Sequence, residues 1–114
     1  IYYYFINYFQ KTSMAKISYI NGFYKTGNNS SISINDRSIH FSDAVYEVIP
    51  VHRFKLIFWK KHVLRLISSL KLLDINYIVN ENILKIKCNE IIKRNNLKEG
   101  IIYLHISRGI APRN

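Results

Sequence analysis

Cysteine, proline and glycine are all scarce in this chain of 114 residues, with one, two and four copies respectively. The single cysteine, Cys88, excludes a disulfide framework and a zinc site built from cysteines. No internal repeat or low-complexity linker is present, and no apolar run approaches the roughly 20 residues that a membrane-spanning helix needs. What the chain has in quantity is apolar side chains, at 48%, including 20 isoleucines. This composition excludes intrinsic disorder and suits one domain with a real core.

Acidic residues are also few, since 7 of them face 17 lysines and arginines, for a formal net charge of +10. Such a charge would suit an acidic partner such as nucleic acid. However, the basic residues are spread along the chain, and their longest runs are the pairs Lys60-Lys61 and Lys93-Arg94. The chain is also rich in Ile, Asn and Tyr, which indicates a general compositional drift. We therefore interpret the charge as a solvated surface and predict neither a nucleic-acid partner nor a membrane partner.

Residues 1–13 do not resemble the rest of the chain, because they begin with the aromatic run I-Y-Y-Y-F-I and contain no Met. They lack the positive start, the longer apolar stretch and the small-residue cleavage site of a secretory signal. We interpret Met14 as the natural start and residues 1–13 as an upstream extension outside the domain. A strand or short helix packing on the domain is the alternative. The lack of an export signal predicts a cytoplasmic protein.

The first half of the chain predicts strands. Residues 17–25 form a hairpin around the Asn21-Gly22 turn, whose residues tolerate positive φ. Residues 31–34 alternate as a second strand, and residues 35–43 are polar and predict a loop. Residues 44–52 and 54–58 are β-branched and aromatic, and they predict a second hairpin despite Pro50.

The second half predicts two helices and a strand. Residues 60–73 carry an apolar stripe at helical spacing: Val63, Leu66, Ile67, Leu70 and Leu73. Asn80 can cap a second helix with its own apolar face of Leu84, Cys88, Ile91 and Ile92. Residues 101–107 form a long apolar strand. The expected fold class is α+β, an antiparallel sheet of hairpins with two helices packed on one face.

The usual motifs of enzyme sites are missing, including the phosphate-binding G-x-x-x-x-G-K-[ST] loop and H-E-x-x-H. The four histidines have no metal-ligand spacing, so no metal site is predicted. Asp36, Asp43 and Glu47 could suggest paired acids, but in a loop-to-strand segment we interpret them as turn formers and surface groups.

One stretch is more specific: residues 35–49 read N-D-R-S-I-H-F-S-D-A-V-Y-E-V-I. This resembles the D-R-G-x-x-F-G-D-G-V-Y-E-V signature of class IV (fold-type IV) pyridoxal-phosphate-dependent aminotransferases, most of all their D-alanine or D-amino-acid branch. Three segments agree in order: Y-I-N-G at 19–22, H-V-L-R-L at 62–66 and I-Y-L-H-I-S-R-G-I-A-P-R at 102–113. The resemblance covers residues 14–114 and identifies them as the small N-terminal domain of such an enzyme.

The resemblance implies pyridoxal 5′-phosphate as cofactor, and it implies roles for five residues. Arg65 matches the arginine that binds the cofactor phosphate, a task suited to a guanidinium fork; the alternative is an exposed arginine opposite the apolar stripe. Tyr46 matches an active-site tyrosine, and Val48, two residues further along the same strand face, would line the substrate pocket. Tyr103 and Arg113 match residues that grip the substrate carboxylate from a loop of the neighbouring subunit, which implies a homodimer in the intact family.

The sequence departs from the family pattern in two ways that bear on the backbone. Three glycines of the signature are replaced by Ser38, Ser42 and Ala44. Any of these positions that needs φ > 0 would carry a strained side chain. The Asn-Gly turn between the two middle strands is replaced by Arg53-Phe54.

The family's Schiff-base lysine would lie beyond residue 114, so no catalytic residue is assigned. We therefore expect an N-terminal fragment of a D-alanine aminotransferase-like enzyme, truncated before its cofactor domain and inactive alone. The expected family reaction transfers an amino group between an amino acid and a 2-oxo acid. Alternatives are a relative of branched-chain-amino-acid aminotransferase or aminodeoxychorismate lyase, and a non-catalytic basic binding domain or remnant.

Overall fold

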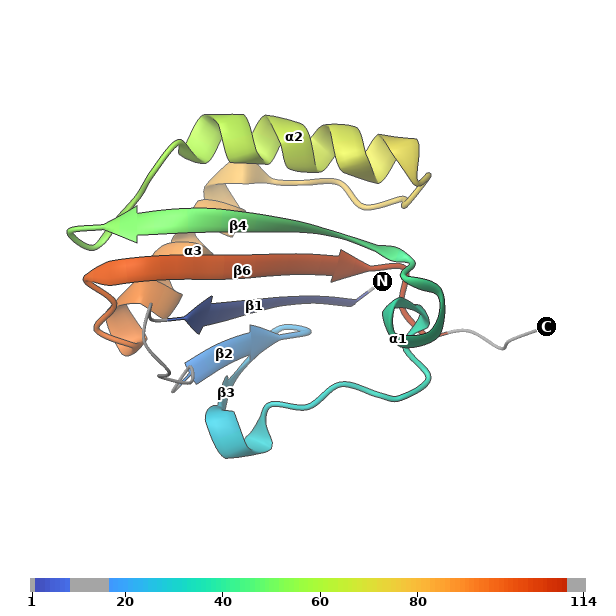
Figure 1. The fold of residues 1–114 in the computed structure, drawn as a ribbon, viewed down its shortest axis with the longest axis horizontal. Helices are drawn as coiled ribbons and strands as arrows, with labels where there is room; N and C mark the ends of the chain where they lie inside the picture. The colour runs from blue at the N-terminus through green and yellow to red at the C-terminus, as the bar shows by residue number, and fades with distance from the viewer. Residues whose placement is uncertain (1, 9–16, 111–114) are drawn as a thin grey trace.

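A single sheet dominates the computed structural model, which describes residues 2–8 and 17–110, with side chains for residues 17–27 and 29–110. Its strand order is β3-β2-β1-β6-β4-β5, and neighbouring strands are antiparallel (Figure 1). The strands are β1 (Tyr2–Tyr8), β2 (Ile17–Ile20), β3 (Phe23–Thr26), β4 (Ala44–His52), β5 (Lys55–Leu56) and β6 (Glu99–Ser107). The helices are η1 (Gly27–Asn29, a 3-10 turn), α1 (Arg37–Phe41), α2 (Trp59–Leu72) and α3 (Glu81–Arg94).

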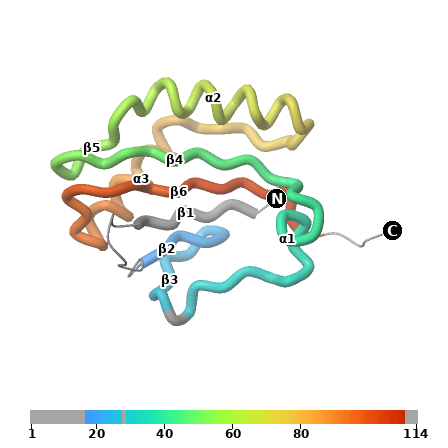
Figure 2. The backbone as a smooth tube through the Cα atoms, in the orientation of Figure 1, coloured from blue at the N-terminus to red at the C-terminus, as the bar shows by residue number. Residues whose placement is uncertain are grey.

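The two long helices pack into one core with the sheet. In the view of Figure 2, α3 lies behind the strands and α2 runs alongside β4. Helix α2 packs on β4, and α3 packs on β1 and β2. Side chains of β4 and β6 alternate accordingly, and their buried apolar set is Val45, Ile49, Val51, Ile102, Leu104 and Ile106. The predicted α+β class, with an antiparallel sheet and two helices on one face, is therefore confirmed. Within the described residues, every helix falls short of the length and apolar character needed to cross a membrane.

The helix stripes agree with their predicted positions, with one difference. In α2, Val63, Leu66 and Leu70 are buried, whereas Ile67 is 36% exposed and Leu73 is 41% exposed. A long straight stripe drifts around a helix of 3.6 residues per turn, so its outer members leave the core. In α3 the whole predicted set is buried: Leu84, Cys88, Ile91 and Ile92. Asn80 caps α3 as expected, because its side chain accepts a hydrogen bond from Ile83 N at 3.1 Å.

Both hairpin turns have two residues with positive φ, but the residues differ. Asn21 and Gly22 join β2 to β3 with φ of 49° and 94°. Arg53 and Phe54 join β4 to β5 with φ of 49° and 65°, a conformation that costs a residue with a Cβ about 1 kcal/mol or more. Strand β5 is only Lys55–Leu56, shorter than the predicted 54–58. Of the three replaced glycines, Ser42 has positive φ, at 51°, where it ends α1.

Two segments between β3 and β4 differ from the sequence expectation. Residues 31–34, predicted as a strand, pair with no strand in the described part of the chain, and all four are exposed. Alternation gives a strand only where one set of side chains is buried, and here neither set is. The predicted loop at 35–43 contains α1, which begins at Arg37 and is capped by Asp36, whose side chain accepts from Ser38 N at 2.9 Å.

Residues 2–8 form a strand inside the sheet, whereas the sequence predicts that residues 1–13 lie outside the domain. Strand β1 pairs with β6 from Tyr2↔Ser107 to Tyr8↔Ile101 and with β2 at Tyr4↔Ile20. Aromatic and β-branched residues favour strands, so this run suits a position between two others. The packed strand was the alternative considered above, and the pairing agrees with it. Met14, proposed as the natural start, lies outside the described residues.

Candidate functional site

The sheet face away from the helices carries three of the predicted site residues. Val48 and Tyr103 are direct cross-strand partners on β4 and β6. The rings of Tyr46 and Tyr103 stack with centroids 5.6 Å apart and planes 10° apart. Tyr46 is 61% exposed. His105, the neighbour of Tyr103 on the same face of β6, meets that ring edge-on at 6.0 Å, and burial lowers the pKa of His105. The sheet thus forms an aromatic patch from Tyr46, Tyr103 and His105.

Arg65, the predicted phosphate ligand, is held by a buried carboxylate. Its Nε and Nη2 donate to Glu47 at 2.9 and 2.8 Å, one to each oxygen. His62, one helical turn earlier, approaches the same carboxylate through Nδ1 at 2.7 Å. The Glu47 side chain is 4% exposed and that of Arg65 is 66% exposed. Hydrogen bonding to Glu47, and then its charge, raise the pKa of Arg65. The guanidinium is therefore held by Glu47 through Nε and Nη2, while the rest of the group is exposed to solvent.

Arg65 and Tyr46 lie on opposite sides of β4, because Glu47 belongs to the helix-covered set and Tyr46 to the other. Strand β5 pairs only with Val51 and His52, so the first part of β4 has a free edge in the described chain. A ligand touching both groups would have to cross the free edge of β4.

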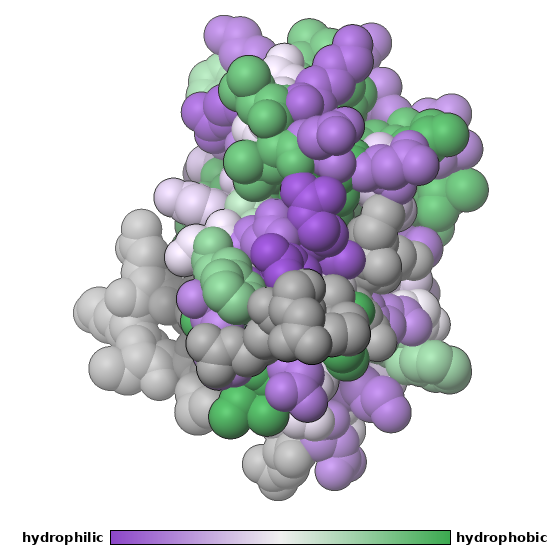
Figure 3. Space-filling view, turned by 90° about the vertical axis from the view of Figure 1, so that its right-hand side faces the viewer, coloured by the Kyte–Doolittle hydropathy of each residue, from purple (hydrophilic) through white to green (hydrophobic). Residues whose placement is uncertain are grey.

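The end of the sheet beside α1 is tied together by a second set of polar contacts. Asp36 is 1% exposed and accepts hydrogen bonds from Ser107 Oγ and Ser38 N. Asp43 accepts from Arg37 Nε at 2.7 Å and Arg108 Nε at 2.8 Å. Burial pushes the pKa of both carboxyls upward, but these donors outweigh it and hold each pKa below its usual value. Figure 3 looks onto this end, where hydrophilic side chains gather near the centre.

Arg113, predicted to bind the substrate carboxylate, lies outside the described residues. The strand that leads toward it is well anchored, since Gly109 O accepts from Arg37 N at 2.8 Å. Arg108 also donates to the carbonyls of Leu73 and Asp74 at the end of α2. The polar contacts at α1 therefore fix the chain up to residue 110.

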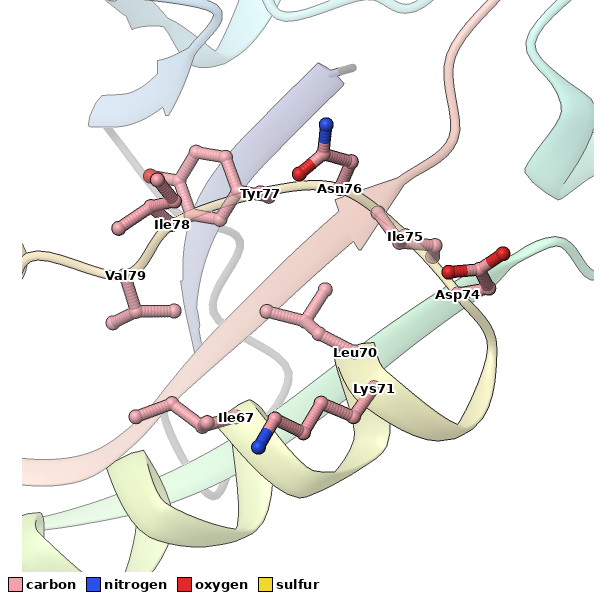
Figure 4. Close-up of a pocket in the computed structure, with 9 residues that line it drawn as sticks. All are labelled: Ile67, Leu70, Lys71, Asp74, Ile75, Asn76, Tyr77, Ile78 and Val79. Carbon is pink, nitrogen blue, oxygen red and sulfur yellow. The ribbon is translucent and has the colours of Figure 1, made fainter.

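A shallow hollow opens beside Arg65, and a larger one lies elsewhere. The first, of about 320 Å³, is lined by Phe58, Lys61, His62 and Arg65. The other, of about 610 Å³, lies between α2 and residues 75–79 (Figure 4), with Leu70 and Ile67 facing Tyr77 and Val79. None of the predicted site residues lines this larger groove. The cationic hollow is the one that suits an anionic ligand.

Other chemistry has little support in the described part of the chain. No three His, Cys, Asp or Glu side chains gather there as metal ligands would. Cys88 is buried in the core, and burial raises the pKa of its thiol to about 12. Such a thiol is a poor nucleophile because it stays protonated at neutral pH.

Sequence reasoning missed the polar partners of the site. Asp36 and Glu47, interpreted as turn-forming and surface groups, are both buried, so the surface interpretation is wrong for them, although Asp36 does cap α1. Glu47 falls in phase with Val45 and Ile49, so its position in the alternation already placed it on the covered face. A carboxylate there needs cationic partners, which was the available clue to Arg65 and His62.

The family model "Amino-transferase class IV" matches residues 44–114, more than half of the chain. The chain belongs to the class IV aminotransferase family.

Among curated proteins, the chain is 38% identical over 103 residues to a D-alanine aminotransferase of Staphylococcus haemolyticus. It is 30% identical over 88 residues to that of Listeria innocua. These matches cover 89% and 76% of this chain but only 36% and 30% of the relatives, so the chain spans about a third of their length.

Solved structures agree on the fold. A putative 4-amino-4-deoxychorismate lyase from Legionella pneumophila superposes with a TM-score of 0.71 at 28% identity, over 77% of this chain and 32% of that one. The branched-chain amino acid aminotransferase of Escherichia coli gives 0.75 at 20% identity, over 82% of this chain and 32% of that one.

Proposed function

We propose that this chain supplies one wall of the active site of a pyridoxal-phosphate-dependent aminotransferase acting on D-amino acids. The observation that carries the proposal is a pair of features: the aromatic patch on the open face of β4 and β6, and the exposed guanidinium of Arg65 on α2, which Glu47 of β4 holds. D-alanine aminotransferase relatives at up to 38% identity support the D-amino-acid branch.

The donor set fits the phosphate of the cofactor. A phosphate group needs several well-directed donors, and Arg65 presents a guanidinium whose Nη1 makes no hydrogen bond within the described chain. Bound there, pyridoxal 5′-phosphate would supply the electron sink for proton transfer at the substrate α-carbon. The chain's own part is to bind and orient.

The substrate would lie over the aromatic patch. Tyr46 offers an exposed phenol, and Val48 and Tyr103 give an apolar surface beside it. Arg113 would hold the substrate carboxylate in a bidentate contact, as the family resemblance implies. The lysine that carries the cofactor would come from the part of the enzyme that relatives have and this chain does not span. The homodimer and the cytoplasmic location also remain predictions.

A chimera tests this proposal. The chain is joined to the remaining two-thirds of the Staphylococcus haemolyticus enzyme and assayed for amino transfer from D-alanine to 2-oxoglutarate, with L-leucine as the competing substrate. We expect turnover with D-alanine, and none from the 114-residue chain alone. A folded chimera that binds pyridoxal 5′-phosphate but transfers only from L-leucine would show that the D-amino-acid assignment is wrong.

A second candidate is an aminodeoxychorismate lyase, favoured by the Legionella pneumophila structure at 28% identity. The same chimera separates the two reactions, because a lyase releases pyruvate from 4-amino-4-deoxychorismate without an amino acceptor. Pyruvate release in the absence of any 2-oxo acid would favour the lyase.

A further inference from the structure

Glu47 is a charged side chain on the aliphatic face of β4, between Val45 and Ile49. A carboxylate in such a place is unfavourable unless it is paired and hydrogen-bonded. Glu47 is paired twice, with Arg65 and with His62. Both partners come from the same face of α2, because residues three apart are neighbours on a helix.

The contact with Arg65 constrains direction as well as distance. Two guanidinium nitrogens donate to the two carboxylate oxygens, and this bidentate geometry fixes the plane of the group. An exposed arginine without such a partner samples many rotamers, so binding a ligand would require ordering it first. Here the ordering is done before any ligand arrives, by a carboxylate that is itself held in the core.

The surface hollow beside Arg65 suits an anion. The hollow that Arg65 lines also contains Lys61 and His62. Helix α2 has no acidic residue in its first turn, and Phe58 caps it without a side-chain hydrogen bond. The negative charge of Glu47 offsets the positive charge of Arg65. Lys61 therefore supplies the net positive charge that attracts the ligand.

We propose that Glu47 is a positioning residue, which fixes the guanidinium of Arg65 so that its remaining N–H groups receive the phosphate of the cofactor. The inference rests on the proposed function. It assigns to the acidic residue of the Tyr46-Glu47-Val48 triplet a role in ligand affinity, separate from its role in packing. The two neighbours of Glu47 face the opposite side of the sheet, so they do not share this role.

Glu47→Asp tests the proposal, because it keeps the charge and shortens the side chain by one methylene. The full 114-residue chain is titrated with inorganic phosphate and with pyridoxal 5′-phosphate, and the Arg65 Nε–H signal is followed by NMR. We expect phosphate affinity to fall about tenfold, the value of one charge-assisted hydrogen bond. Glu90→Gln, which removes a carboxylate from an arginine pair elsewhere, should leave phosphate affinity unchanged.

Glu47→Gln separates position from charge. If Glu47 mattered only as a charge, Glu47→Asp would bind phosphate like the wild type and Glu47→Gln would bind it more tightly, and this pattern would overturn the proposal. Should neither variant fold, as judged by its amide spectrum, Arg65→Lys replaces them at an exposed position. That variant keeps the charge without the bidentate contact, so an unchanged phosphate affinity would also overturn the proposal.

The mobility of the Arg65 Nε–H is measured without ligand. This measurement therefore tests positioning by Glu47 separately from the proposed function. If the wild-type chain binds no phosphate, the phosphate site of the proposed function fails. A rigid Nε–H of Arg65 that becomes mobile in Glu47→Asp still supports positioning by Glu47. An Nε–H that is equally mobile in both proteins contradicts it.

Discussion

The two faces of the β4–β6 pair come from alternating residues of the same two strands, yet they have different chemistry. The covered face is aliphatic apart from Glu47, and its residues are almost fully buried. The open face carries Tyr46, Tyr103 and His105, with contacts among the rings. Burial selects the first face, because aliphatic side chains stabilise the fold by leaving water. Packing against α2 does not require aromatic and titratable groups on the second face, which is the face that the proposed function assigns to the substrate.

The largest expected effect belongs to the covered face. Leu104→Ala should lower the free energy of unfolding by about 3 kcal/mol, because Leu104 is 1% exposed and its removal leaves a cavity. Val48→Ala, on the open face of the neighbouring strand, is the matched control and should cost about 1 kcal/mol or less. Urea unfolding followed by circular dichroism measures both. Equal costs for the two variants would remove the distinction between the faces.

The covered face was also the more predictable of the two from sequence. The β-branched and aromatic run at 44–52 predicted β4 with its observed bounds, and the helical stripes predicted most of the buried faces of α2 and α3. These patterns work because one set of side chains repeats with the period of its element. Residues 31–34 alternate as well, but they bury nothing, so the same rule failed there.

The candidate site was predictable only in part. Motifs that resemble a known family located Tyr46, Val48, Arg65 and Tyr103, whereas composition and periodicity could not. The ties that hold these groups join residues far apart in sequence: Glu47 to Arg65, and Asp36 to Ser107. Such pairs depend on which strand lies beside which, and this is set by tertiary packing. The phase of Glu47 in β4 indicates that its carboxylate is buried and needs partners, but a single sequence does not say which residues these are.

The polar contacts that join both strands to α1 should have the next largest effect. Asp43→Asn should cost about 2 kcal/mol at neutral pH, because Asp43 accepts charge-assisted hydrogen bonds from Arg37 and Arg108. The pKa of Asp43 is lowered in the folded state, so its contribution is present above the unfolded pKa of about 3.9 and is lost as pH falls through the folded value.

Thermal melts of wild type and Asp43→Asn at decreasing pH check this. The difference in melting temperature should shrink as the wild-type carboxyl is protonated, although a residual acid dependence from Asp36 remains in both proteins. A difference that stays constant down to the lowest pH at which the proteins fold would contradict the assignment of Asp43.

A change in the β4–β5 turn, which belongs to neither face, should raise the free energy of unfolding by a smaller amount. Replacing Arg53-Phe54 by Asn-Gly gives the β4–β5 turn the residues of the β2–β3 turn, and it should gain about 1 kcal/mol by relieving two positive φ angles. Gly22→Ala is the reciprocal control: no atom lies within 4 Å of the added Cβ, so any loss reports backbone strain alone. If both variants shift the urea midpoint in the same direction, backbone conformation does not explain either.

The smallest effect on stability is expected on the open face, where Tyr46 and Tyr103 stack. A double-mutant cycle with Tyr46→Leu and Tyr103→Leu should give a coupling of about 1 kcal/mol, typical of an aromatic pair.

Tyr46→Phe keeps the ring and removes only the hydroxyl, so it should leave the urea midpoint unchanged. In the chimera, however, the same Tyr46→Phe change should lower D-alanine turnover at least several-fold, since an active-site phenol contributes through its hydrogen bond. A variant that melts like the wild type but turns over slowly would separate ligand chemistry from packing on one strand. Unchanged turnover would instead leave the open face without a role in the reaction.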